Sequence, residues 1–313
     1  MLERRVPSIW VVAAAALLGG AACRSPAESP KEPPPPVEES ASPSKPTELT
    51  GVDISALTSR EKSKWNEYVT ELLAPCPDQP VSVAQCVSES KPCAACVPAA
   101  KFLVDRVRRG DARPQAEAAY RMRFSPDAVK KLDIEGSPAK GAERPVVTVV
   151  EWADFDCPFC AVAAPLLKEL VEKHPDEVRV VFKHYPLAVH QHAENAARAA
   201  VAAHQQGKFW SLSQALFEAQ KDGLDEEKVL ELARTAGLEM KDFQAALGSE
   251  ATADSVARDR KQADELGLEG TPMIYINGRY FNFEHFDLRQ DLDPWVELEI
   301  AMATPAAAQA KKN

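Results

Sequence analysis

Two cysteines separated by two residues, Cys157 and Cys160, directly follow a β-branched apolar segment, and this feature most constrains the fold of the chain. The segment at 146–152 reads VVTVVEW, which is typical of a strand whose two faces are covered by helices. Apolar residues then recur at helical spacing, at Ala161, Ala164, Leu167, Leu170 and Val171. The sequence therefore predicts an α/β fold in which the dithiol lies where a strand ends and a helix begins.

The position of Cys157 predicts a reactive thiolate. Unpaired backbone N–H groups and the helix dipole stabilise a thiolate at a helix N-terminus, where cysteine pKa values of about 3.5–7.5 are typical. Pro158 suits this first turn, since its fixed φ is helical and its missing N–H would have had no partner. Cys157 is thus the predicted attacking sulfur, and Cys160 is predicted to resolve the mixed disulfide. The alternatives are a structural disulfide or half of a zinc site, although the preceding cysteine, Cys96, lies far back in what looks like another domain.

Glu151 lies within the predicted strand, where a charge is costly unless it has a function. An acid buried beneath a dithiol can relay the proton of Cys160 as that thiol becomes the second attacking thiolate. The alternative is that Glu151 faces solvent at the edge of the sheet.

A second group of signals begins at Pro272. The apolar run 273–276 and the Asn277-Gly278 dipeptide predict a strand followed by a hairpin turn into Arg279-Tyr280-Phe281. Because an X-Pro bond is cis in only about 5–6% of cases, the local sequence does not predict a cis bond before Pro272.

Taken together, these segments resemble the DsbA-like thioredoxin-fold thiol:disulfide oxidoreductases. The motifs that carry the resemblance are Cys157-Pro158-Phe159-Cys160, His184-Tyr185-Pro186-Leu187, Gln206-Gly207-Lys208-Phe209-Trp210 and Gly270-Thr271-Pro272. The resemblance covers roughly 140–303 and implies a βαβ unit, a helical insertion at about 188–249 and a closing αββα segment. It also implies that Pro272 is cis and lies against the dithiol, that Thr271 exposes its backbone to a substrate strand, and that Glu151 is the buried acid.

Apolar periodicity within the insertion agrees with three helices, marked by Ala196, Ala199, Ala200 and Ala203, then Phe209, Leu212, Leu216 and Phe217, then Val229, Leu230, Leu232 and Ala233. His190 and His192 precede them as a His-x-His pair, and His184 lies near the expected active-site side of the sheet. Residues two apart do not share a helical face, so we predict no metal site at the pair. We also predict no cofactor.

The first 22 residues predict export from the cytosol. Charged residues at 3–5, a short apolar stretch at 9–18 and small residues before Cys23 form a signal segment whose apolar core is too short for an ordinary transmembrane helix. The segment resembles a bacterial lipoprotein signal with Cys23 as the lipidated residue, although Gly20 stands where Leu is common. An ordinary export signal cleaved after Ala22 is the alternative.

Composition divides the rest of the chain. Residues 23–50 are rich in Pro, Ser and Glu and are predicted to form a disordered tether. A small helical module with four cysteines is predicted at 51–127, and a linker at 128–144. The thioredoxin-type domain is predicted at 145–303 and a flexible tail at 304–313.

The cysteines of the helical module are Cys76, Cys86, Cys93 and Cys96. Two disulfides that staple a small exported core are the favoured interpretation, and the sequence does not choose among the three possible pairings. A tetrathiolate zinc site and a second redox dithiol at Cys93 and Cys96 are the alternatives. Without Cys23, the remaining cysteines form an even set, as an oxidising compartment favours.

The net charge of −10 and the absence of a basic stripe argue against a nucleic-acid partner. The predicted function is a thiol:disulfide oxidoreductase on the periplasmic side of the bacterial cell envelope, anchored to a membrane by its N-terminal lipid. Its predicted partners are exported thiol proteins and a membrane or soluble redox partner that resets the dithiol. The resemblance favours an oxidant; a reductase, an isomerase and a non-catalytic binding lipoprotein are the alternatives.

Overall fold

A computed structural model describes residues 48–76 and 80–303. The predicted signal segment 1–22, Cys23, nearly all of the predicted tether 23–50 and the predicted tail 304–313 lie outside the described residues. Within the described ranges, no helix combines the length and the apolar character that a membrane span requires.

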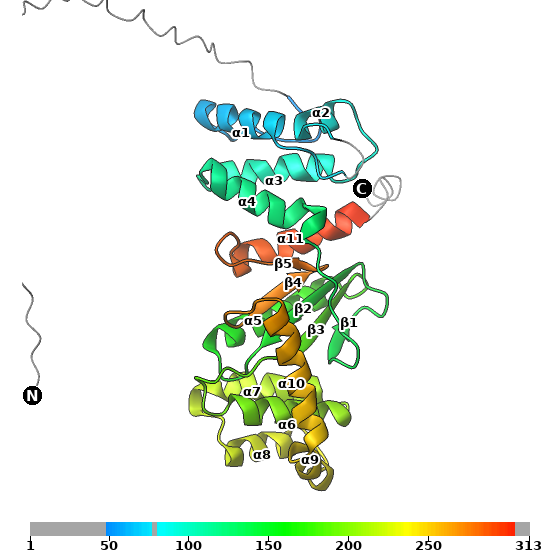
Figure 1. Ribbon diagram of the computed structural model, residues 1–313, viewed down its shortest axis with the longest axis vertical. Coiled ribbons are helices and arrows are strands. Elements are labelled where there is room, and N and C mark those ends of the chain that lie inside the picture. Colours follow the sequence, from blue (N-terminus) through cyan, green and yellow to red (C-terminus); the bar gives the residue numbers. More distant parts are fainter. Residues whose placement is uncertain (1–47, 77–79, 304–313) are drawn as a thin grey trace, which may run out of the picture. The chain divides into compact units, whose positions relative to one another are not determined.

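One five-stranded sheet carries the predicted dithiol, with the strand order β1-β3-β2-β4-β5 (Figure 1). Its strands are β1 Ala139–Gly141, β2 Val147–Ala153, β3 Val178–His184, β4 Met273–Ile276 and β5 Arg279–Tyr280. β2 and β3 are parallel, whereas β4 pairs antiparallel with β2, and β5 pairs antiparallel with β4. The turn between β4 and β5 has positive φ at both Asn277 and Gly278, as a two-residue type I′ hairpin requires. The βαβ unit and the hairpin that the sequence predicts are therefore present.

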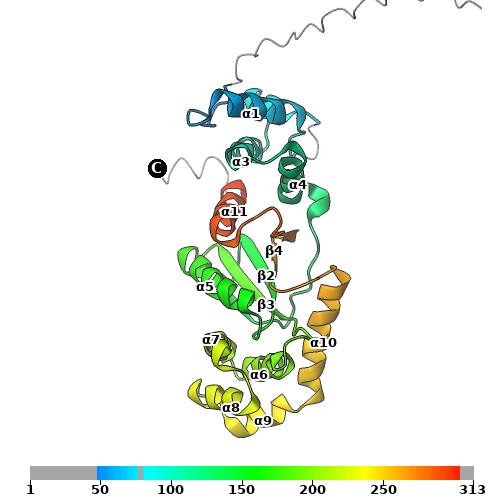
Figure 2. The same cartoon turned by 90° about the vertical axis from the view of Figure 1, so that its left-hand side faces the viewer.

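Both faces of β2 are buried because helices cover the sheet on each side. On one face, Val147 and Val149 pack with residues of α5 (Pro158–Lys173) and α11 (Leu288–Ala303). On the other face, Trp152 packs with Ala263 of α10 (Glu250–Glu265). Figure 2 shows α5 and α11 on one side of the sheet and α10 on the other. This double coverage explains why β2 is a continuous β-branched run rather than an alternating one.

The helical insertion lies between β3 and α10. It contains α6 Ala193–Gln205, α7 Phe209–Ala219, the 3₁₀ turn η2 Gln220–Asp222, α8 Glu226–Thr235 and α9 Met240–Leu247. Its apolar core also includes Cys157 and Cys160, so the insertion borders the dithiol.

The predicted cysteine-containing helical module precedes the sheet. It consists of α1 Ser59–Glu71, α2 Val83–Ser88, α3 Cys96–Arg108 and α4 Arg113–Phe124, followed by the 3₁₀ turn η1 Pro126–Ala128. Trp65, Tyr68 and Leu103 lie in its core, and Trp65 donates its indole N–H to the carbonyl of Ala100 at 3.1 Å. The sequence does not indicate the short helix α2, because its six residues are too few for a helical period to be visible.

Three arginines of the module contact the C-terminal segment of the thioredoxin-type domain. Arg106 donates to the carbonyl of His285 at 2.7 Å, Arg109 forms an ion pair with Asp291, and Arg123 donates to Glu299 at 2.6 Å. Arg106 lies in α3, Arg109 directly follows α3 and Arg123 lies in α4, and their contacts reach α11 or the loop before it. The two regions predicted as separate domains therefore share a charged interface.

The predicted linker at 128–144 is wrong in its second half, because Ala139–Gly141 forms β1 and pairs antiparallel with β3. Gly141 has φ of 108°, and a Cβ at that position would collide with the carbonyl of Val178. A strand of three residues with the sequence Ala-Lys-Gly carries no apolar alternation, so periodicity does not indicate it.

Candidate active site

Cys157 occupies the N-cap of α5, directly beyond the end of β2. Pro158 is the first helical residue, and Cys160 lies in the first turn. The two cysteine residues are 3% and 0% exposed, whereas the Phe159 between them is 71% exposed. Neither sulfur is oxidised in this structure, so the site is described as a dithiol. The predicted strand–turn–helix setting of the dithiol is present.

The environment of Cys157 lowers the pKa of its thiol to about 5. The largest cause is a hydrogen bond from the thiol of Cys160; Thr271 and the backbone N–H groups of Cys160 and Phe159 act in the same direction, while burial opposes them. The hydroxyl of Thr271 is buried and has no hydrogen-bond partner among the residues that the structure describes, and so it is available to donate to a thiolate. The sequence predicts stabilisation by the helix amides and the dipole, whereas in the structure the thiol of the resolving Cys160 contributes most.

Cys160 has the opposite character. Burial raises the pKa of its thiol, and the neighbouring Cys157 and Glu151 raise it further. The backbone N–H of Asp154 lies 3.4 Å from the Cys160 sulfur and opposes these effects only in part. Cys160 therefore keeps its proton near neutral pH and needs a base before it can attack.

Glu151 lies in the middle of β2, with β3 on one side and β4 on the other. The residue is 3% exposed, so the alternative of a solvent-facing acid at the sheet edge is wrong. Burial raises the pKa of its carboxyl to about 8, and the charge of Cys157 acts in the same direction. Oε1 of Glu151 has no hydrogen-bond partner within the described chain. The result is a buried acid whose proton can leave at moderately alkaline pH.

Thr271 and Pro272 lie against the dithiol. The Thr271–Pro272 peptide bond is cis, and the Cys157 sulfur is 3.3 Å from the carbonyl oxygen of Thr271. A groove of about 800 Å³ runs beside these residues. Phe159 and Val162 of α5 line one part of it, and residues of the loop at 282–287 and of the start of α11 line another. The site thus combines a polarised sulfur with a neighbouring backbone and a partly apolar groove.

Comparison with known proteins adds a family to this geometry. A family model described as Thioredoxin matches residues 133–294, which is more than half of the chain. The chain belongs to the thioredoxin family. The family match confirms the predicted thioredoxin fold, and it includes β2, α5, the insertion and the Thr271–Pro272 bond.

Several solved structures are similar to this thioredoxin-family chain. A thioredoxin-like oxidoreductase from Silicibacter pomeroyi DSS-3 is 30% identical with a TM-score of 0.46, over 52% of this chain and 91% of that one. Oxidised BdbD from Bacillus subtilis is 22% identical with a TM-score of 0.48, over 56% of this chain and 98% of that one.

Among curated proteins, Na(+)/H(+) antiporter NhaA 3 of Salinispora tropica is 37% identical over 154 residues, which is 49% of this chain and 23% of the antiporter. The chain thus spans about a quarter of the length of the curated relatives it matches.

A buried carboxylate that the sequence argument did not identify lies behind the thioredoxin dithiol. Asp154 is 1% exposed, accepts a hydrogen bond from the backbone N–H of Leu187 at 2.9 Å, and lies 2.7 Å from Nδ1 of His190. Burial opposes protonation of His190, but the bond to Asp154 and the charges of Asp154 and Cys157 outweigh it and raise its pKa. In the sequence, the only sign of this contact was an Asp between the strand and the dithiol. Its partner, His190, lies 36 residues further along the chain, and the fold brings the two side chains together.

The other histidines have different surroundings. The backbone N–H of His192 donates to Asp156 at 3.2 Å. His184 is buried among the rings of Phe155, Phe182 and Phe209. Burial lowers its pKa to about 4, and neither ring nitrogen has a partner in the described residues. His184 therefore packs as a neutral ring.

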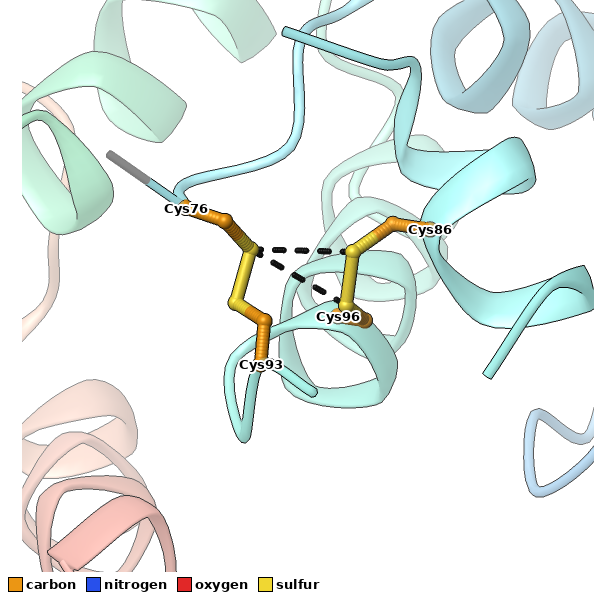
Figure 3. Close-up of side chains that lie close together, drawn as sticks. All are labelled: Cys76, Cys86, Cys93 and Cys96. Carbon is orange, nitrogen blue, oxygen red and sulfur yellow. Dashed lines mark hydrogen bonds between the residues drawn. A yellow bond between two sulfur atoms is a disulfide. The ribbon is translucent and has the colours of Figure 1, made fainter. Parts of the chain in front are cut away.

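The four cysteines of the helical module lie together and apart from the thioredoxin dithiol. Cys76 is bonded to Cys93, and Cys86 is bonded to Cys96 (Figure 3). Cys93 and Cys96 are therefore not joined to each other, as the alternative of a second CxxC redox pair would have them. The sequence left the pairing open because it depends on the packing of α2 against α3.

Proposed function

We propose that this protein is an exported thiol:disulfide oxidoreductase that forms or exchanges disulfide bonds in extracytoplasmic proteins through Cys157 and Cys160. The observation that carries the proposal is the unequal pair of thiols. Cys157 is polarised toward its thiolate with a pKa of about 5, whereas burial keeps Cys160 protonated. A structural disulfide does not require two thiols of different pKa, whereas a nucleophilic thiol and a resolving thiol do.

The reaction proceeds through a mixed disulfide at Cys157. When the Cys157–Cys160 disulfide is formed, a substrate thiolate attacks the Cys157 sulfur, the bond between the two cysteines breaks, and Cys160 takes up a proton. A second substrate thiolate then attacks the substrate sulfur of the mixed disulfide and releases Cys157 as a thiolate. The substrate gains a disulfide and the protein gains the two electrons. A thiol of low pKa leaves readily and stabilises the reduced form, which favours the oxidising direction.

Glu151 acts in the steps that involve Cys160. In the reverse direction Cys160 attacks the mixed disulfide, and its proton must go to a base because burial disfavours a free thiolate. The buried Glu151 carboxyl, with its raised pKa and unpartnered oxygen, supplies that base. In the forward direction the same group returns the proton to Cys160.

Thr271 and Pro272 serve the substrate chain. The carbonyl of Thr271 lies beside the reactive sulfur, and the adjoining groove presents Phe159 and Val162. An extended substrate segment placed along this backbone brings its own sulfur to Cys157. The substrates we propose are exported thiol proteins, and a separate membrane or soluble redox protein resets the dithiol.

The signal segment supports export, and Cys23 is the proposed site of the lipid that holds the protein on the periplasmic side of the envelope. Mass spectrometry of the mature N-terminus, from cells expressing the full chain, tests this part of the proposal. A diacylated Cys23 is the expected result. An unmodified Cys23 at the mature N-terminus would contradict lipidation but leave export intact.

The catalytic proposal is tested with two single variants of the full chain. Cys157→Ser is expected to abolish turnover of a dithiol peptide, whereas Cys160→Ser is expected to accumulate a covalent complex that dithiothreitol releases. Full turnover by Cys157→Ser would remove the mechanism.

The redox potential of the Cys157–Cys160 pair decides whether the protein oxidises or reduces its substrates. It is measured on the full chain in glutathione buffers, with the oxidation state of the pair read by peptide mass spectrometry. A value near about −120 mV indicates an oxidant, and a value near about −270 mV indicates a reductase. Failure to exchange with any thiol would leave a non-catalytic binding lipoprotein.

A further inference from the structure

The two disulfides of the helical module lie side by side in one cluster of sulfur atoms. The four Sγ atoms all lie within 4.8 Å of one another. The Cys76 sulfur is 3.6 Å from that of Cys86 and 3.9 Å from that of Cys96, although it is bonded to neither (Figure 3). Thiol–disulfide exchange requires that one sulfur reach another, and this arrangement supplies that proximity.

Access to the cluster is uneven. Cys93 is partly exposed, whereas Cys76, Cys86 and Cys96 are 7%, 0% and 3% exposed. An external thiolate therefore meets the cluster at the Cys93 sulfur. The bond that it would break is Cys76–Cys93, and the sulfur that it would set free is that of Cys76, the atom nearest to the second disulfide.

The structure also favours Cys96 as the final leaving group. Cys96 is the first residue of α3, where the positive end of the helix dipole favours a thiolate. Its backbone N–H donates to the carbonyl of Cys93 at 3.3 Å, so the two residues share one tight turn. They are placed as a CxxC pair even though each is bonded elsewhere.

We propose that this cluster is a second thiol–disulfide exchange centre, separate from Cys157 and Cys160, which takes electrons from an external dithiol at Cys93 and holds them as a Cys93-Cys96 dithiol. Cys76 and Cys86 are the residues that carry the exchange inward. The module then has a redox function of its own in addition to its structural one.

The steps balance. A thiolate of the donor attacks Cys93, the Cys76–Cys93 bond breaks, and Cys76 leaves as a thiolate. The second donor thiolate attacks the donor sulfur of the mixed disulfide, which leaves the donor as a disulfide and Cys93 as a thiol. Cys76, now free to rotate, attacks Cys86, so that Cys76–Cys86 forms, Cys86–Cys96 breaks and Cys96 is released. The donor loses two electrons and two protons, the cluster gains them, and one disulfide remains.

The test uses the full chain with Cys157→Ser and Cys160→Ser, so that the first centre cannot react and failure of its proposed role cannot affect the result. The chain is equilibrated with increasing dithiothreitol, quenched with iodoacetamide and mapped by peptide mass spectrometry. The expected one-disulfide form retains Cys76–Cys86 and is alkylated at Cys93 and Cys96. A form that retains Cys86–Cys96, or simultaneous loss of both disulfides, would overturn the proposal.

A second variant tests the inward transfer without any reductant. Cys96→Ser leaves Cys86 as a thiol beside the Cys76–Cys93 bond, and transfer is expected to give Cys76–Cys86 with an alkylatable Cys93. Ala95→Ser, which retains all four sulfurs, is the matched control and is expected to keep the native pairing. Persistence of Cys76–Cys93 together with alkylation of Cys86 in the Cys96→Ser chain would also overturn the proposal.

Discussion

At the scale of single residues, hydrogen bonding and burial give three acidic groups different proton affinities. The pKa of Cys157 is lowered to about 5, that of Glu151 is raised to about 8, and burial raises that of Cys160. At neutral pH the first sulfur is therefore a thiolate, while the acid and the second sulfur keep their protons. Attack by Cys157 needs no base, but attack by Cys160 does.

We expect Glu151→Gln to slow the release of mixed disulfides by Cys160 by on the order of 10²-fold, since an amide cannot accept the proton. In the native protein this rate should rise as the pH increases through about 8, where the carboxyl loses its proton. Stopped-flow release of a peptide from Cys157 measures it. Glu169→Gln, an exposed change on α5, is the control. A variant that keeps the native pH profile would contradict the relay.

Cys157 also links stability to pH. Its folded pKa of about 5 lies below the value near 9 of an unperturbed thiol, so the stabilisation it gives the reduced fold is complete above about pH 9 and is lost as the pH falls through about 5. We expect the difference in free energy of unfolding between the reduced native chain and Cys157→Ser to increase from pH 5 to pH 9. Urea denaturation under reducing conditions measures this difference. A difference independent of pH would show that the thiolate is not stabilised.

At the scale of secondary-structure elements, a buried ion pair joins β3 to α10. Lys183 and Asp259 have side chains only 3% and 4% exposed, and their charged atoms are 3.0 Å apart. Asp259 also accepts the backbone N–H of His184 at 3.0 Å. The Asp259 carboxylate thus pairs with the buried ammonium group of Lys183 and accepts the backbone N–H at the end of β3.

Asp259→Asn should destabilise the chain by about 3–5 kcal/mol, because it leaves the Lys183 charge buried without its partner. Asp254→Asn, an exposed change on the same helix, should alter stability by no more than about 0.5 kcal/mol. The midpoint of urea unfolding compares the two variants. Equal midpoints would mean that Lys183 finds another partner or loses its proton in the fold.

Elements with long periodic patterns, and the hairpin marked by Asn277-Gly278, were predictable from the sequence, whereas the short β1 and α2 were not. The β-branched run of β2 and the apolar spacing of α5 identified the strand, the helix and the dithiol between them. β1 has three residues and α2 has six, too few for a period to be visible. The contact between Asp154 and His190 depends on the backbone path after β3, which no local pattern describes.

At the scale of the whole molecule, the helical module and the thioredoxin domain are joined through buried charge. The Arg123 side chain is 1% exposed; it bonds to Glu299 and lies over the ring of Trp295, 4.8 Å from its centroid. Ala119 of α4 packs in the same apolar cluster as Trp295. The sequence predicted two separate regions, and the arginines that join them follow no periodic pattern that would indicate the interface.

We expect Arg123→Gln to uncouple the two regions. Helices α1 to α4 should then open at lower denaturant than the sheet, because Glu299 loses its ion pair with Arg123 and the ring of Trp295 loses the guanidinium. Hydrogen exchange with peptide resolution, at increasing urea, reports the two openings. Arg121→Gln is the control, since that side chain is 75% exposed. Parallel loss of protection in both regions of the Arg123→Gln chain would contradict the coupling.

The exposed ring of Phe159 affects which proteins can bind beside the dithiol. Because the ring lies exposed between the two cysteines, a chain that binds beside the dithiol can cover it. Cysteines flanked by aliphatic or aromatic neighbours gain from that contact, whereas those in highly charged segments do not. The selectivity of the protein among client cysteines is thus expected to follow the hydrophobicity of their surroundings.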